Sequence, residues 1–141
     1  MTRRSWAEFR SDLPEDVIED DEGFIERGGR GVTHAIASLL EQLGCQVDPP
    51  IYADEHGWEI DFHWRGRRLW CQITLIEGYI FVMEDPAWFS KRSKKNKAIY
   101  FDILTRFAEA LSADHRFDNI GWYLSNDLLG GGPGAKRPVS D

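Results

Sequence analysis

The sequence has few of the residues that would impose an architecture on their own. Its only cysteines are Cys45 and Cys71, which cannot form a disulfide framework, so we expect both to be small buried hydrophobic residues. No apolar run is long enough for a signal peptide or a membrane span. Cations are the minority, with 17 Lys and Arg against 24 Asp and Glu. We therefore expect a cytoplasmic protein that binds neither membranes nor nucleic acid.

Recognisable catalytic motifs are also missing. The glycines of Gly28-Gly29-Arg30-Gly31 lack both a preceding apolar strand and the spacing of a phosphate-binding loop. Glu59, Asp61 and His63 alternate along one stretch, which is compatible with metal ligation and equally typical of a solvated strand face. No nucleophile stands beside a base. We expect no catalytic residue, no cofactor and no metal site.

Composition divides the chain into three parts. Residues 1–28 are predicted to be an acidic N-terminal arm, either a solvated segment or a docking strip for a basic partner. Residues 29–126 are predicted to be a single α+β domain. The Gly- and Pro-rich residues 127–141 read as a flexible tail. The carboxylates of the arm are concentrated between residues 15 and 26, at Glu15, Asp16, Glu19, Asp20, Asp21, Glu22 and Glu26.

Two stretches have helical periodicity. The first is followed by Gly44, which stands where a C-terminal cap belongs, and the second runs from about residue 97 to residue 112. Their apolar positions are Val32, Ala35, Ile36, Leu39, Leu40 and Leu43, and Ile99, Tyr100, Ile103, Leu104, Phe107, Ala108 and Leu111.

Between the helices, three alternating runs predict an antiparallel meander. The runs cover residues 58–64, 68–75 and 79–84, and the pairs Arg65-Gly66 and Glu77-Gly78 between them are typical of tight hairpin turns. Residues 51–52 suggest an edge strand, and residues 119–124 a last strand. The predicted class is α+β, with an antiparallel β-meander of three to five strands packed with two main helices in the order α-β-β-β-α-β.

Hairpin register predicts which residues share a face of the sheet. If both turns have two residues, 63 faces 68, 74 faces 81 and 72 faces 83. One face is then a core, and the other runs from charged to aromatic. Either another element covers the aromatic end, or this face docks a partner. Its predicted partner-binding residues are the anchors Trp70, Tyr79, Phe81 and Met83, with Glu59, Asp61 and Arg68 supplying specificity.

The order of elements over residues 32–124 resembles small proteins of the type III secretion chaperone-like class. The resemblance implies an acidic, non-catalytic module, often dimeric, that holds another polypeptide. Small acidic bacterial immunity proteins, which block a toxin by direct contact, have the same physical profile. The residues that carry the resemblance are Leu39-Leu40-Glu41-Gln42-Leu43-Gly44, Gly57-Trp58-Glu59-Ile60 and Arg67-Arg68-Leu69-Trp70.

A second resemblance points to an enzyme. Residues 59–62 followed by 69–74 resemble the core of restriction-endonuclease-like nucleases, which would carry Asp61 onto the metal-binding aspartate and Glu41 onto the helical glutamate. Gln72 and Thr74 stand where that family has a carboxylate and a lysine, so metal binding and water activation both lose a group.

We therefore expect a non-catalytic module that binds another protein through the outer face of the sheet. Because this chain is acidic, a basic partner protein would suit it. The module would be an immunity-type inhibitor or a secretion-chaperone-like partner. A degenerate or metal-dependent nuclease is the alternative, and a homodimer through the same face is a further one.

Overall fold

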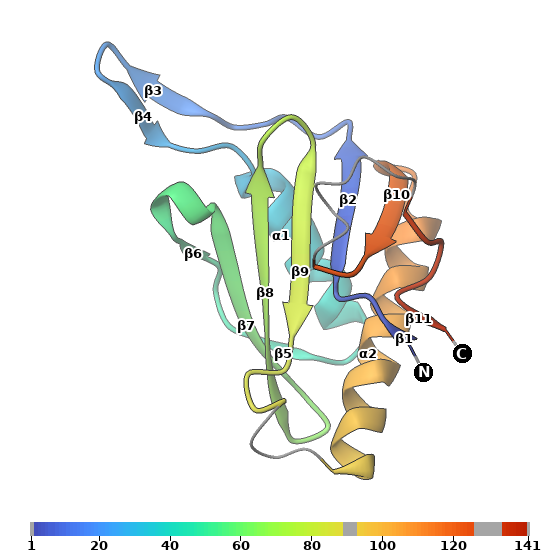
Figure 1. Ribbon diagram of the computed structural model, residues 1–141. Coiled ribbons are helices and arrows are strands. Elements are labelled where there is room, and N and C mark those ends of the chain that lie inside the picture. Colours follow the sequence, from blue (N-terminus) through green and yellow to red (C-terminus); the bar gives the residue numbers. More distant parts are fainter. Residues whose placement is uncertain (1, 89–92, 126–133, 141) are drawn as a thin grey trace.

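Seven antiparallel strands form the central sheet, and both α-helices pack against the same face of it (Figure 1). The computed structural model describes residues 2–88, 93–125 and 134–140. The strand order is β10-β2-β9-β8-β7-β5, and β6 also pairs with β7. The strands are β2 (Trp6–Ser11), β5 (Gln46–Val47), β6 (Ile51–Tyr52), β7 (Trp58–Trp64), β8 (Arg67–Leu75), β9 (Tyr79–Glu84) and β10 (Phe117–Tyr123).

Smaller elements complete the described chain. A 3-10 turn, η1 (Asp54–His56), precedes β7. Two further pairs of strands lie outside the central sheet. They are β1 (Thr2–Arg3) with β11 (Val139–Ser140), and β3 (Ile18–Asp20) with β4 (Gly23–Glu26). The α+β class with an antiparallel sheet and two main helices is confirmed.

The two helices form where the apolar periodicity predicts them. In α1 (Arg30–Gln42), Val32, Ile36 and Leu40 are fully buried, and Gly44 adopts a φ of 100° just beyond the end of the helix. In α2 (Lys94–Ala113), the N-cap Ser93 accepts a hydrogen bond from the amide of Asn96. Within the described residues, neither helix offers an apolar stretch of membrane-spanning length.

The β7–β8 hairpin has the predicted register. Arg65 and Gly66 have φ values of 46° and 79°, and two successive positive φ values are typical of the two-residue turn that matches strand twist. His63 lies opposite Arg68, and Asp61 lies opposite Trp70. The second hairpin differs.

Three residues, 76–78, connect β8 to β9, where the sequence suggested two. Leu75 therefore pairs with Tyr79, and Ile73 pairs with Phe81. Because side chains alternate along a strand, this one-residue shift exchanges the two faces of β9. The predicted pairs 74–81 and 72–83 are wrong. The shift places Tyr79, Phe81 and Met83 in the core and turns Ile80 and Val82 toward the other face.

The N-terminal segment supplies an interior strand of the sheet. β2 lies between β9 and β10, and its Ala7 and Phe9 are fully buried. The sheet thus has seven strands, not three to five, and the predicted order omitted every strand before α1. Residues 6–11 belong to the domain and do not form an arm outside it. Of the predicted acidic arm, the β3–β4 hairpin is the part that projects from the sheet (Figure 1).

The C-terminal segment closes against the N-terminus. Ala135 exchanges two backbone hydrogen bonds with Trp122, and β11 pairs with β1. Residues 134–140 of the predicted flexible tail are therefore held in place, while residues 127–133 and 141 lie outside the described residues.

The hydrophobic core lies between the sheet and the helices. Phe81 stacks on Phe107 at a ring distance of 5.0 Å and meets Trp122 edge-on at 6.1 Å. Cys45 and Cys71 are buried and free, as predicted, and burial raises the pKa of the Cys45 thiol to about 11. Neither thiol is suited to nucleophilic chemistry.

Candidate functional site

The sheet has one face without a helix on it in the described part of the chain (Figure 1). We call it the outer face. A single row of paired residues crosses it from β10 to β6. The row consists of Tyr123, Trp6, Val82, Gln72, Glu59 and Ile51. Flanking rows add Glu8, Ile80 and Thr74 on one side, and Glu84, Trp70 and Asp61 on the other.

An apolar strip lies at the centre of the outer face. Trp6 is directly opposite Val82 across β2 and β9, while Trp70 is a diagonal neighbour of Val82 on β8. Val82 is only 3% exposed, although it points away from the core. The two tryptophans that neighbour it are half-buried themselves. Ile80, also half-buried, extends the strip beside Trp6.

Carboxylates surround the apolar strip. Glu59 accepts a hydrogen bond from the Gln72 amide at 3.4 Å, and Asp61 accepts one from the Arg68 guanidinium at 3.3 Å. Glu8 on β2 is exposed. The Arg68 side chain is 65% exposed, so its pairing with Asp61 is solvent-screened. Glu8, Glu59, Asp61 and Glu84 outnumber the cations Arg10 and Arg68 on this face, so the rim is mostly negative.

A polar cluster holds the end of β9 to the N-terminus. Glu84 accepts hydrogen bonds from Arg3 at 2.5 Å and from the Ser5 hydroxyl at 2.6 Å. The Arg3 guanidinium also lies over the Trp88 ring, 4.5 Å from its centroid. Tyr100 of α2 donates to the Met83 carbonyl, and burial raises the pKa of its phenol. With its hydrogen bonds satisfied inside the protein, this cluster reads as a structural clamp.

The predicted partner-binding residues separate into two groups. Four of them, Glu59, Asp61, Arg68 and Trp70, lie together on the outer face. The three aromatic and methionine anchors of β9 do not. Tyr79 is 3% exposed, and burial, followed by the charges of Glu15 and Asp16, raises its pKa to about 12. Phe81 and Met83 are fully buried and cannot contact a partner in the folded protein.

Sequence reasoning missed three residues of the apolar strip, Trp6, Ile80 and Val82. Trp6 belongs to a short alternating run with buried Ala7 and Phe9, a strand signal that was missed because residues 1–28 were treated as one acidic arm. Ile80 and Val82 were assigned to the core because the turn before them was taken as two residues long. The alternation of side chains between the two faces was visible in the sequences of both β2 and β9.

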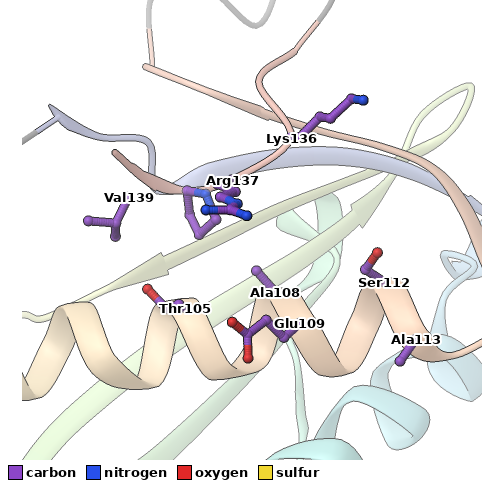
Figure 2. A pocket seen from close by; sticks show the side chains of 9 residues that line it. Thr105, Ala108, Glu109, Ser112, Ala113, Lys136, Arg137 and Val139 are labelled. Atoms are coloured by element: carbon purple, nitrogen blue, oxygen red, sulfur yellow. The ribbon is translucent and has the colours of Figure 1, made fainter. Parts of the chain in front are cut away.

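A groove of about 450 Å³ lies on the helix side of the molecule, between α2 and the C-terminal segment (Figure 2). Thr105, Glu109 and Ser112 line it from α2, and Arg137 and Val139 face them from the segment. The lining residues include no histidine and no cysteine, and Glu109 is their single carboxylate. The groove therefore offers no carboxylate pair and no nucleophile–histidine pair for catalysis.

The residues of the nuclease resemblance are not assembled. Asp61 and Gln72 project from the outer face, whereas Glu41 is on α1, which packs on the opposite face (Figure 1). Among the described residues, no three His, Cys, Asp or Glu side chains are grouped in a way that could hold a metal ion.

Comparison with known proteins gives no relative. The chain matches no protein-family model, no curated protein and no solved structure.

Proposed function

We propose that this chain is a non-catalytic protein-binding module that holds a basic partner protein against the outer face of its sheet. The observation that supports the proposal is the strip of Trp6, Val82 and Trp70 among carboxylates, on the face without a helix. A desolvated aromatic centre with a polar rim is the usual anatomy of a protein interface. The negative rim favours a positively charged partner surface.

Two partner classes fit this chemistry, and both are compatible with a cytoplasmic location. An immunity-type inhibitor would hold a folded toxin whose activity is lost in the complex. A secretion-chaperone-like protein would hold an extended segment that stays unfolded while bound. An activity assay on the captured partner, with and without this chain, separates the two.

A second copy of the chain is a poorer occupant of the outer face. Two copies meeting there would bring two mostly negative surfaces together, which is unfavourable. We therefore expect a monomer. Sedimentation velocity over a dilution series should give the monomer mass of 16.3 kDa throughout. A dimer that the substitution Gln72→Arg dissociates would assign the face to self-association instead.

A matched pair of glutamine substitutions tests the binding role. Gln72 lies at the centre of the outer face, and Gln42 is exposed at the end of α1. Gln72→Arg places a bulky cation in the interface, and we expect it to weaken partner binding at least ~30-fold, the scale of a hot-spot residue. Gln42→Arg adds the same charge elsewhere and should leave affinity unchanged.

The partner is first captured from the native host with the wild-type chain and identified by mass spectrometry. Its affinity for both variants is then measured by calorimetry, after circular dichroism has shown that each variant is folded. Equal affinity of Gln72→Arg and Gln42→Arg would refute binding through the outer face.

A further inference from the structure

The β3–β4 hairpin is a second unpartnered surface, separate from the outer face. β3 pairs with β4 alone among the described strands, so each keeps one edge with unpaired backbone groups. Figure 1 shows the hairpin projecting beyond the end of the central sheet. A two-stranded hairpin is marginally stable by itself in water, and a third strand is the usual remedy. An open edge of this kind is a template for strand addition.

Exposed aliphatic side chains are concentrated on this hairpin and at its base. Ile18 is 43% exposed, Ile25 is 60% exposed, and the preceding Val17 is 40% exposed. Ile76, in the adjoining β8–β9 turn, is 68% exposed. Four of the six large hydrophobic residues that are exposed in the described chain therefore belong to this one region. Solvated hairpins have no need of such residues, and their clustering indicates a contact surface.

A notch at the base of the hairpin could receive an apolar side chain. It has a volume of about 310 Å³, and Val17, Leu75 and Ile76 form its apolar wall. Gly28 also lines it. A Cβ at that position would lie 2.6 Å from Leu75 Cδ2 and 2.7 Å from the Glu15 carbonyl oxygen, so the chain packs closely there. Glu15 and Arg27 complete its lining.

The negative charge of the β3–β4 hairpin determines which kind of partner could bind to it. Glu19, Asp20, Asp21 and Glu22 lie on β3 and the turn, and they would repel the same hairpin of a second copy. They would also repel an anionic membrane or nucleic acid. Glu26 of β4 forms an ion pair with Arg30 at 2.6 Å, and no other carboxylate of the hairpin forms an ion pair among the described residues. All three residues of β3 are exposed, so β3 offers the more open edge.

We propose that the β3 edge binds an extended, cationic segment of a partner protein, which adds to the hairpin as a third strand. Basic side chains of that segment pair with Glu19 and Asp20, which lie on opposite faces of β3, and its aliphatic side chains lie against Ile18 and the notch. This surface is distinct from the outer face, so Gln72→Arg does not affect it.

A synthetic peptide of alternating Lys and Val, labelled with fluorescein, is the probe. We expect saturable binding by fluorescence anisotropy, weakened by salt because screening acts on exposed charges. Two-dimensional NMR should show slower exchange of the β3 amides in the complex. A peptide with Pro in place of alternate Val residues, which cannot form the strand ladder, should bind at least ~10-fold more weakly.

Matched serine variants locate the binding. Ile18→Ser/Ile25→Ser should weaken the peptide about tenfold or more, because apolar burial is lost on the hairpin. The control is Leu124→Ser, which changes a residue that is 43% exposed just beyond the end of β10 and should have no effect. The proposal is overturned if the Lys–Val peptide does not bind, if the Pro peptide binds equally well, or if Ile18→Ser/Ile25→Ser retains full affinity.

Discussion

The two faces of the sheet use hydrophobic residues in different ways. On the helix side, Phe81 is fully buried between Phe107 and Trp122. On the outer face, its neighbour along the strand, Ile80, is half-buried beside Trp6. Adjacent residues of β9 therefore have different roles: Phe81 stabilises the core, and Ile80 forms part of the surface. The comparison predicts large stability effects on one face, and large binding effects with small stability effects on the other.

Truncation on β9 is the sharpest test of that difference. Phe81→Ala should lower the free energy of unfolding by about 3–5 kcal/mol, because it removes a buried ring and leaves a cavity. Ile80→Ala should cost about 1 kcal/mol, the scale of a half-exposed strand position. Urea denaturation of both variants provides the measurement. Equal losses would mean that the two faces of β9 are not distinguished in this way.

Ion pairs offer a second comparison between buried and exposed positions. Arg67 and Asp85 meet at 2.6 Å with side chains 14% and 2% exposed, whereas Arg68 and Asp61 meet at 3.3 Å near solvent. Asp85→Ala should cost about 3 kcal/mol, because it leaves the Arg67 charge without its partner in a largely buried site. Asp61→Ala should cost less than about 1 kcal/mol. Thermal unfolding of the two variants gives the difference, and a reversed order would contradict it.

The Tyr79 hydroxyl tests whether the buried face of β9 is purely structural. It is buried and has no hydrogen-bond partner among the described residues. Tyr79→Phe removes a polar group that gains nothing from burial, so it should be neutral or stabilising by up to about 1 kcal/mol. Partner binding should not change. If Tyr79→Phe lowered the affinity for the partner without changing stability, Tyr79 would belong to the binding interface after all.

The smallest effect concerns the turn after α2. Arg116 donates hydrogen bonds to Asp114 and holds the pKa of that carboxyl at about 2, below its ordinary value of 3.8. A depressed folded-state pKa contributes stability above pH 3.8, and that stability is lost as the pH falls toward 2. NMR titration should find the low value, and Arg116→Gln should raise it. An unchanged pKa in Arg116→Gln would exclude Arg116 as its cause.

Local patterns were sufficient for part of this fold. The apolar periodicity of α1 and α2 and the positive-φ pair Arg65-Gly66 are encoded within short stretches, so they could be predicted. The β8–β9 turn could not, because Glu77-Gly78 fits a two-residue loop as well as the three-residue loop that forms. Gly78 has another role here, since a Cβ would lie 3.2 Å from the Phe9 carbonyl oxygen of β2.

Long-range pairing was beyond the sequence patterns. β2 enters the sheet between β9 and β10, far from both in the chain, and nothing local in residues 6–11 identifies those neighbours. The same holds for the pairing of Thr2 with Ser140. Consequently the charged part of the candidate site, Glu59, Asp61 and Arg68, was predicted, whereas Trp6 was not.

Photo-crosslinking is the most direct test of the outer face as a binding surface. A photoreactive amino acid is placed at position 74, in a flanking row of the outer face, or at position 112, on α2 beside the groove. Each protein is irradiated with the captured partner, and the products are analysed by mass spectrometry. We predict a crosslink from position 74 and none from position 112. A crosslink from position 112 alone would place the partner on the helix side and contradict the proposed function.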